Sequence, residues 1–167
     1  MKLLDNTQIR QKITRLAYEI LERNFEYSEL ILAGINNNGT RLAELLKAEL
    51  AHIKPTVAIH LTTIRLSPAE PTSKAVELGL SADHIHGKCV IIVDDVANTG
   101  RTIFYALKPL LEVVPAKVEV AVLVDRKHKM FPIEVDYYGM TLATTLQENI
   151  DVQIHEEQRE ETAVYLN

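Results

Sequence analysis

The chain has 167 residues, a formal net charge of −5, and hydrophobic and charged fractions of 47% and 25%. This length fits one domain with a sizeable core, and the composition is ordinary for a soluble globular protein. The acidic balance counts against RNA or DNA as the main partner, because nucleic-acid binding usually shows a basic footprint. A local basic patch would still suffice for RNA, which stays open as a partner but is not favoured.

No feature of the sequence directs the chain to a membrane or to an oxidising compartment. Residues Met1–Asp5 are interrupted by polar side chains and do not resemble a signal peptide. No apolar run approaches the roughly 18 residues that a membrane helix needs. The single cysteine, Cys89, cannot form an internal disulfide, which agrees with a reducing compartment. We therefore expect a cytoplasmic protein with no membrane partner.

The first part of the chain alternates between helix and strand patterns. Apolar residues at helical spacing predict an amphipathic helix over 8–23. Residues 30–35 form an apolar run typical of a buried strand, and a second strand is expected over 57–61. Between them, Asn36–Gly39 predicts a turn, because Asn and Gly tolerate left-handed backbone. A helix is expected over 40–53.

The second part repeats the alternation after a long interruption. Residues 64–86 contain prolines and glycine without a sustained period, which predicts a functional or mobile loop. Residues 88–94 form a continuous apolar strand, typical of a parallel sheet covered on both faces. A helix over 101–113 and a strand over 118–124 follow, and the residues after 149 suggest short strands around an acidic turn. This order predicts one doubly wound α/β domain spanning the whole chain, with a mostly parallel central sheet.

The segment 90–102 carries the clearest functional signal. An apolar strand leads to Asp94 and Asp95, at the carboxyl end where open α/β sheets bind ligands. The following Ala97–Thr102 has small residues whose backbone amides can converge on an anion at the start of a helix. The two carboxylates would repel phosphate, but they suit the hydroxyls of a neighbouring diol, since carboxylates only accept hydrogen bonds.

A ribose 5-phosphate satisfies both requirements, and negative charge near its ring would favour a cationic transition state. On residue types alone, an ordinary capped helix start with solvated carboxylates explains the segment equally well. Other phosphate-binding motifs are absent from the sequence, which has neither a P-loop nor a dinucleotide-binding glycine turn.

Residues 90–102, VIIVDDVANTGRT, closely resemble the phosphoribosyl-pyrophosphate signature of type I phosphoribosyltransferases. The likeness extends over most of the chain and is strongest to the branch that combines pyrimidine-operon regulation with uracil phosphoribosyltransferase activity. The further segments that carry it are Leu21–Asn24, Leu32–Ile35, Leu123–Arg126, His128, Pro132–Ile133, Asp136–Tyr137 and Gly139.

The resemblance implies a central sheet, a flexible flap over 64–86, a small hood or base-binding element, and a homodimer. Asp94 and Asp95 would be the catalytic carboxylates, binding the ribose hydroxyls and also Mg²⁺, mostly through substrate and water. The turn 36–39 would bind pyrophosphate through strained backbone, in which the family's loops often have a cis peptide. The resemblance gives substrate-binding roles to Asn37, Asn38, Gly39, Arg65, Val96, Ala97, Asn98, Thr99, Gly100, Arg101, Thr102, Arg126 and Tyr137.

Several residues depart from that branch. Asn37-Asn38-Gly39 stands where the pyrophosphate loop usually has Thr-Arg-Gly, so the guanidinium that would clamp pyrophosphate is missing. The flap keeps only Arg65 of its usual motif, and Met140 replaces a lysine. Two functions therefore stay open: a transferase that joins phosphoribose to a uracil-like or purine base, and a non-catalytic sensor of phosphoribosyl-pyrophosphate or nucleotide that binds RNA or protein. A third reading, an unrelated phosphosugar-binding domain, requires the likeness to be accidental.

Overall fold

A six-stranded sheet forms the centre of the computed structural model, which describes residues 1–143, 145, 147–155 and 162–167. Its strand order is β4-β3-β2-β5-β6-β7, and all neighbours are parallel except β3 and β4. The strands span β2 Glu29–Ile35, β3 Ala58–Arg65, β4 Glu77–Leu78, β5 Cys89–Ala97, β6 Lys117–Arg126 and β7 Tyr137–Leu142. The predicted α/β class with a mostly parallel sheet is therefore confirmed.

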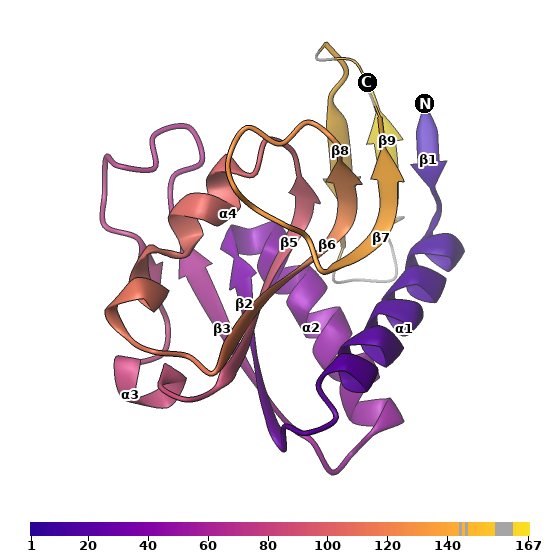
Figure 1. Cartoon of the computed structure of the whole chain (residues 1–167). Coiled ribbons are helices and arrows are strands. Elements are labelled where there is room, and N and C mark those ends of the chain that lie inside the picture. The colour runs from indigo at the N-terminus through magenta and orange to yellow at the C-terminus, as the bar shows by residue number, and fades with distance from the viewer. Residues whose placement is uncertain (144, 146, 156–161) are drawn as a thin grey trace.

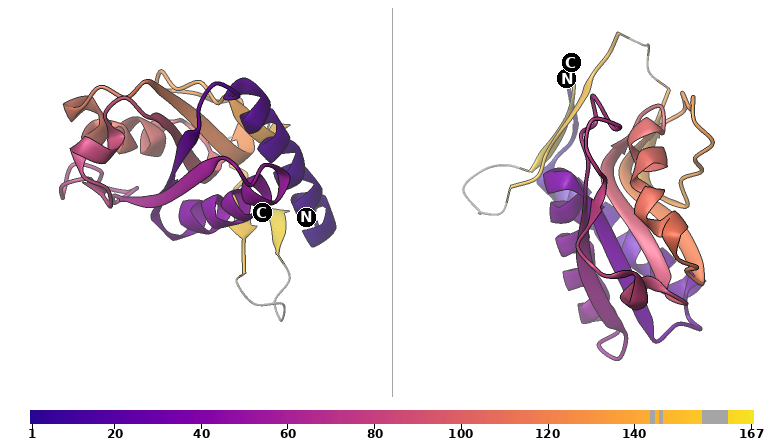
Figure 2. Two further views of the ribbon diagram at one scale, coloured as in Figure 1. Left: turned by 90° about the horizontal axis from the view of Figure 1, so that it is seen from below. Right: turned by 90° about the vertical axis from the view of Figure 1, so that its left-hand side faces the viewer.

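Helices cover both faces of this sheet (Figures 1 and 2). The two long helices, α1 Asn6–Arg23 and α2 Asn36–Ile53, pack side by side on one face, and their apolar stripes join one core cluster. The other face carries α3 Ala82–Ile85, α4 Arg101–Ala106 and a 3₁₀ helix at Lys108–Glu112, over a second cluster. The side chains of β5 alternate between the two clusters, so β5 contributes to the core on both faces of the sheet.

A small antiparallel sheet, the hood, lies beyond the arrowhead ends of the central strands (Figure 1). It has the order β1-β9-β8, formed by Lys2–Leu4, Ala163–Leu166 and Ile150–Gln153. The two short strands predicted after residue 149 are β8 and β9, and the acidic turn expected between them lies outside the described residues. The prediction did not include β1, because three residues show no measurable period.

The turn predicted at Asn36–Gly39 is wrong, because α2 begins at Asn36 directly after β2. Asn36 has a φ of 50°, so one left-handed residue redirects the chain from strand to helix. Gly39 then lets this first turn lie against β5: a Cβ there would stand 2.5 Å from the Val93 carbonyl oxygen. The expected cis peptide is absent from the described residues, although the left-handed Asn36 supplies the expected unusual backbone.

The segment 64–86 is only partly the loop that its sequence predicted. β3 continues to Arg65, and β4 returns antiparallel beside it, with the Gly79 amide donating to the Thr63 carbonyl at 3.1 Å. Ile85 of α3 is fully buried in the second core cluster. Residues 66–76 are thus the irregular part, held at both ends by regular structure.

The helix predicted over 101–113 is shorter than expected. α4 ends at Ala106, and Pro109 lies at the start of the 3₁₀ helix that follows. Proline has no amide hydrogen, and its ring clashes with the carbonyl four residues earlier, so it does not continue an α-helix. Across the described residues, no helix is both long enough and apolar enough to cross a membrane.

Candidate functional site

The carboxyl ends of β2 and β5 form the centre of the candidate site. The chain leaves β2 into α2 on one face and leaves β5 towards α4 on the other, so a crevice opens between these strands, as open α/β sheets generally provide. Asp94 and Asp95 lie near the carboxyl end of β5, at this crevice. The sequence therefore placed both carboxylates at the correct end of the correct strand.

Two adjoining cavities flank the carboxylate pair. One, of about 410 Å³, is lined by the first turn of α2, by Asp94 and Asp95, and by Ile150 from the hood. The other, of about 550 Å³, is lined by residues 96–103 together with Met130 and Phe131. Pro68, Val96, Asn98 and Thr102 line both cavities. The two cavities together form one site, with the carboxylates in the smaller cavity and the Ala97–Thr102 loop in the larger one.

The loop between β5 and α4 has the geometry of an anion cradle. Gly100 has a φ of 86°, a left-handed conformation, and a Cβ there would come within 3.2 Å of the Ile133 side chain. The Thr99 carbonyl accepts hydrogen bonds from the Met130 amide at 2.9 Å and the Phe131 amide at 3.2 Å. The amides of Thr99 and Gly100 donate to no backbone atom of the described residues, so they stay free for an anion in the larger cavity.

Asp94 and Asp95 differ in their surroundings. Asp94 is 8% exposed, whereas Asp95 is half-buried. Burial, together with the neighbouring charge of Asp95, raises the pKa of the Asp94 carboxyl well above its usual range. Each carboxylate also accepts from the next backbone amide, Asp94 from Asp95 and Asp95 from Val96, both at 2.9 Å. These short local bonds fix both carboxylates at the crevice.

The three asparagines at the start of α2 each make a different contact. Asn36 forms two hydrogen bonds with the backbone of Leu66. Asn36 Nδ2 donates to the Leu66 carbonyl at 3.0 Å, and the Leu66 backbone amide donates to Asn36 Oδ1 at 3.1 Å. Asn37 Oδ1 accepts from the Arg65 guanidinium at 3.2 Å. Asn38 Nδ2 donates to Asp95 Oδ2 at 2.9 Å. One helical turn thus reaches both the flap and the carboxylate pair.

The two predicted arginines near the loop are engaged by protein atoms. Arg101 donates to the Pro68 carbonyl at 2.6 Å, so its side chain points to the flap. Arg126 is 8% exposed and donates to Asn98 Oδ1 at 3.2 Å and to the Thr145 carbonyl at 2.8 Å. Arg126 therefore fixes the Asn98 side chain at the edge of both cavities.

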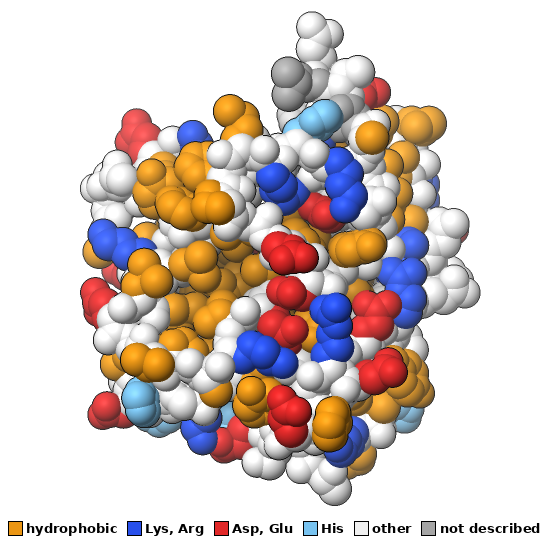
Figure 3. All heavy atoms as spheres, viewed as in Figure 1, with side chains coloured by type: hydrophobic (Ala, Val, Ile, Leu, Met, Phe, Trp, Pro, Cys, Tyr) orange, Lys and Arg blue, Asp and Glu red, His pale blue; other side chains and the backbone are white. Residues whose placement is uncertain are grey.

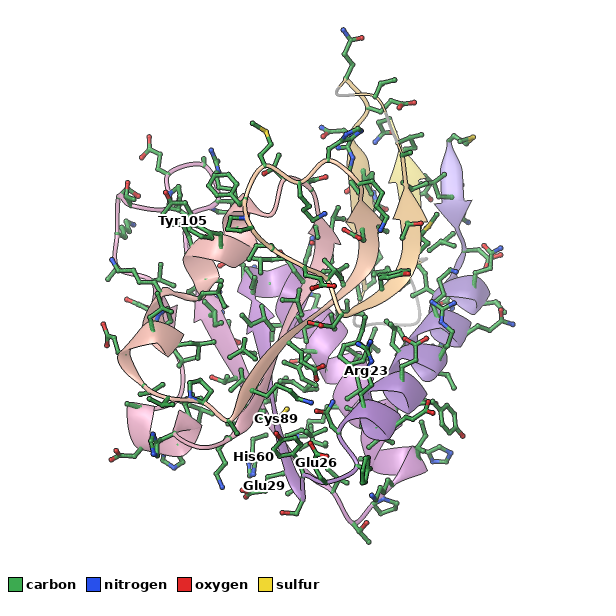
Figure 4. All side chains as sticks on the ribbon, viewed as in Figure 1. Arg23, Glu26, Glu29, His60, Cys89 and Tyr105 are labelled. Atoms are coloured by element: carbon green, nitrogen blue, oxygen red, sulfur yellow. The ribbon has the colours of Figure 1, made fainter. Side chains whose placement is uncertain are left out.

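Tyr137 does not line the site, contrary to the role that the resemblance implied. Its side chain is fully buried, and its hydroxyl donates to both carboxylate oxygens of Glu119, at 2.9 and 3.0 Å. Asn24 Nδ2 also contacts Glu119, at 3.0 Å. Figure 4 shows Arg23 and Cys89, which contact this network, at the lower end of the sheet, away from the α4 end. The residues next to Tyr137 gave no sign of this partner, because Glu119 lies 18 positions earlier in the chain.

Several residues of the cavities were not among the predicted ones. Ile150 reaches the smaller cavity from the hood, and Met130 and Phe131 line the larger one from the β6–β7 connection. Phe131 packs against Phe104, with ring centroids 5.3 Å apart. Apolar side chains in loops carry no motif, so no signal in the sequence indicated that these residues line the cavities.

The donor set fits a hard cation only if substrate completes its coordination. No cluster of three or more His, Cys, Asp or Glu side chains occurs within the described ranges. The Asp94 and Asp95 pair offers carboxylate oxygens alone, which suits Mg²⁺, a cation that keeps several waters and uses few protein ligands. The site is consistent with a metal held mostly by phosphate oxygens and water.

Comparison with known proteins identifies the chain's relatives. The phosphoribosyl transferase domain model matches residues 2–157. The Bifunctional protein PyrR of Fusobacterium nucleatum is 38% identical over 98% of this chain and 96% of its own length. The protein of the same name from Haemophilus ducreyi is 38% identical over 90% and 88%.

Solved structures agree on the fold. A hypoxanthine phosphoribosyltransferase of Trypanosoma cruzi superposes with a TM-score of 0.78 at 20% identity, covering 99% of this chain and 94% of its own. A hypoxanthine-guanine phosphoribosyltransferase of Bacillus anthracis gives a TM-score of 0.70 at 21% identity, covering 84% and 81%. With the signature loop, the carboxylate pair and the hood in place, the chain belongs to the phosphoribosyltransferase family and is a pentosyltransferase of the type I fold.

Proposed function

We propose that this chain transfers phosphoribose from 5-phosphoribosyl-1-pyrophosphate to a ring nitrogen of a uracil-like or purine base and releases pyrophosphate. The observation that carries the proposal is the pair of adjoining cavities, which combine an anion cradle at Ala97–Thr102 with the two carboxylates of β5. Phosphate, a neighbouring diol and a leaving group at the adjacent carbon are the features of this one substrate.

In the proposed reaction Asp94 and Asp95 accept hydrogen bonds from the ribose hydroxyls, while amides of the Thr99–Gly100 turn donate to the 5-phosphate. Positive charge develops on the ribose ring as the bond to pyrophosphate breaks, and a fixed carboxylate nearby stabilises it. When bound, Mg²⁺ would neutralise the pyrophosphate leaving group. The protein's own contribution is to orient both ends of the substrate and to keep the carboxylates in place.

The base belongs to the side of the site where apolar side chains gather. Ile150, Met130 and Phe131 offer apolar contacts in the two cavities that Asn98 also lines, and the Phe131 ring is planar. Asn98 Oδ1 already accepts from Arg126, so its Nδ2 is the group left to donate. A donor suits a base carbonyl, which uracil-like bases and oxopurines both carry.

A sensor that binds the same ligand without turnover is the second candidate, and the first turn of α2 favours it. Asn38 stands where the family's arginine would clamp pyrophosphate, and its amide contacts Asp95 instead. In this role, ligand binding would change how the chain binds RNA or another protein.

A homodimer is part of either proposal. Figure 3 shows apolar side chains gathered on the half of the molecule that carries α3 and α4, and Leu111 and Met130 are both 79% exposed.

Pyrophosphate release distinguishes the two candidates. The chain is incubated with phosphoribosyl-pyrophosphate, Mg²⁺ and a panel of bases: uracil, cytosine, hypoxanthine, guanine and adenine. We expect release that depends on the base, and faster release with carbonyl-bearing bases than with adenine. If no base causes pyrophosphate release but calorimetry shows that phosphoribosyl-pyrophosphate binds, the transferase proposal is contradicted and the sensor proposal stands. Absence of both would contradict both.

A further inference from the structure

Asn38 donates a side-chain hydrogen bond to the Asp95 carboxylate. The bond joins Asn38 Nδ2 to Asp95 Oδ2 at 2.9 Å, between the first turn of α2 and the end of β5. A carboxylate can only accept, so the amide must turn its nitrogen toward Asp95, and the choice between oxygen and nitrogen is settled by chemistry. The other carboxylate oxygen, Oδ1, accepts from the Val96 amide. Both oxygens of Asp95 therefore accept hydrogen bonds, one from α2 and one from its own strand.

Asn38 is itself held firmly in place. Gly39, the next residue, lets α2 approach the β5 backbone so closely that a Cβ would lie 2.5 Å from the Val93 oxygen and 3.3 Å from Asp94 Cα. Asn36 and Asn37 bind the stem of the flap at Leu66 and Arg65. The helix turn that carries Asn38 is thus fixed against the central strand and against the flap at once.

We infer that Asn38 is a positioning residue, which orients the Asp95 carboxylate, and not a ligand of the pyrophosphate end. One N–H of its amide is engaged by Asp95, its oxygen can only accept, and the neutral amide lacks the charge and the paired donors by which an arginine clamps pyrophosphate. The inference rests on the proposed function for the identity of the reaction, but the contact between the two side chains stands without it. In this chain, the residue at the position where the family's arginine would clamp the leaving group contacts Asp95, at the proposed ribose end of the site.

The test is a double-mutant cycle on Asn38→Ala and Asp95→Ala, with both single variants and the double variant. The substrate is phosphoribosyl-pyrophosphate with the best base of the panel, and kcat and KM are measured separately. Asn38→Ala should lower kcat about 10- to 100-fold, the loss expected for one hydrogen bond to a charged group, and should raise KM for phosphoribosyl-pyrophosphate by no more than it weakens the binding of ribose 5-phosphate. In the Asp95→Ala background the same substitution should have almost no effect. Alanine favours helix, so the first turn of α2 should form in each variant.

Asn37→Ala is the matched comparison. It removes a neighbouring amide that contacts Arg65 and not Asp95, so its effect should be the same whether residue 95 is aspartate or alanine. An Asn38→Ala variant that raises KM at unchanged kcat would overturn the inference, because that is the signature of a lost substrate ligand. An effect of Asn38→Ala that is fully retained in Asp95→Ala would overturn it as well.

Calorimetric binding of ribose 5-phosphate by the same proteins separates this inference from the proposed function. This ligand has the phosphate and the hydroxyls but no leaving group, so it needs no turnover. Asn38→Ala should weaken its binding only when Asp95 is present. If wild type turns over no base and the binding cycle still shows this dependence, the transferase proposal fails and the positioning role stands. Equal weakening in both backgrounds refutes the positioning role, whatever the enzyme does.

Discussion

Asp94 is held in surroundings that disfavour its charge. The residue is 8% exposed beside Asp95, and burial with this like charge raises its pKa. A carboxyl with a raised pKa in the folded state binds its proton more readily there than in the unfolded chain, so stability falls as the pH rises through the folded-state value. Asp94→Asn should therefore stabilise the fold at neutral pH by about 0.5–2 kcal/mol and should abolish most of the activity.

Thermal unfolding measured between pH 4 and pH 8 checks this expectation. Each kcal/mol corresponds to about 2–4 °C in Tm for a chain of this size. The gain should be largest at pH 8 and shrink toward pH 4, where wild-type Asp94 also carries its proton. Glu44→Gln, which removes one exposed carboxylate from the outer face of α2, is the control and should change Tm little at any pH. A lower Tm for Asp94→Asn at pH 8 would contradict the argument.

Tyr137 is a structural residue, and its substitution should show that. Its hydroxyl donates to Glu119, which is 7% exposed, so Tyr137→Phe leaves a buried carboxylate with one donor fewer. The expected cost is about 1–3 kcal/mol in the free energy of unfolding, with KM for the base unchanged. Tyr138→Phe is the matched control, because Tyr138 is 41% exposed on the opposite face of the same strand. A changed KM in Tyr137→Phe alone, at unchanged stability, would restore the residue to the base pocket.

At the scale of elements, the flap is fastened at its stem more firmly than its sequence indicates. Asn36 pairs with Leu66 through two hydrogen bonds, and Arg101 holds the Pro68 carbonyl from the other side of the cavity. Asn36→Gly keeps the left-handed backbone, which glycine adopts freely, while it removes both bonds to the flap. We expect hydrogen exchange over residues 66–76 to quicken about tenfold or more, and exchange in β5 to stay slow.

The comparison for this prediction is Asn37→Gly, which removes a single contact with the exposed Arg65 side chain. Its effect on exchange over the same residues should be much smaller. Equal exchange rates in Asn36→Gly and wild type would show that the stem does not depend on this amide. Exchange as slow over 66–76 as in β5 in wild type would contradict the flap role itself.

The sequence predicted these elements well where one period persists. The apolar stripe of α1 and the unbroken run of β5 were sufficient, because burial on one or two faces leaves a repeating pattern. It predicted the loop 97–102 because chemistry there requires particular small residues. It failed at Asn36, whose left-handed backbone starts a helix where a turn was expected, and at Tyr137, whose buried partner Glu119 lies 18 positions away. Pairings between distant residues leave no local signal.

At the scale of the whole molecule, the hood shares its core with the central sheet. Val152, Ile154 and Val164 of the hood region belong to the same apolar cluster as Leu16 and Leu42 of the long helices. We therefore propose that residues 1–167 unfold as one domain. Far-UV circular dichroism and a Tyr165→Trp reporter in β9, in a chain without native tryptophan, should give the same urea midpoint. A reporter in α4, Phe104→Trp, should agree with both, whereas an earlier midpoint at residue 165 alone would make the hood a separate unit.

The pairing of β1 with β9 also determines the order in which the chain can take shape during translation. Leu4 of β1 faces the core, but its partner strand, at Val164, leaves the ribosome some 160 residues later. β1 therefore stays unpaired until β9 has been made, whereas β2, β5 and β6 can pair with one another earlier. The loop 97–102 is synthesised long before Ile150, which lines the smaller cavity from the hood. In a nascent chain, the proposed anion-binding loop can therefore form first, and the hood that completes the cavity forms last.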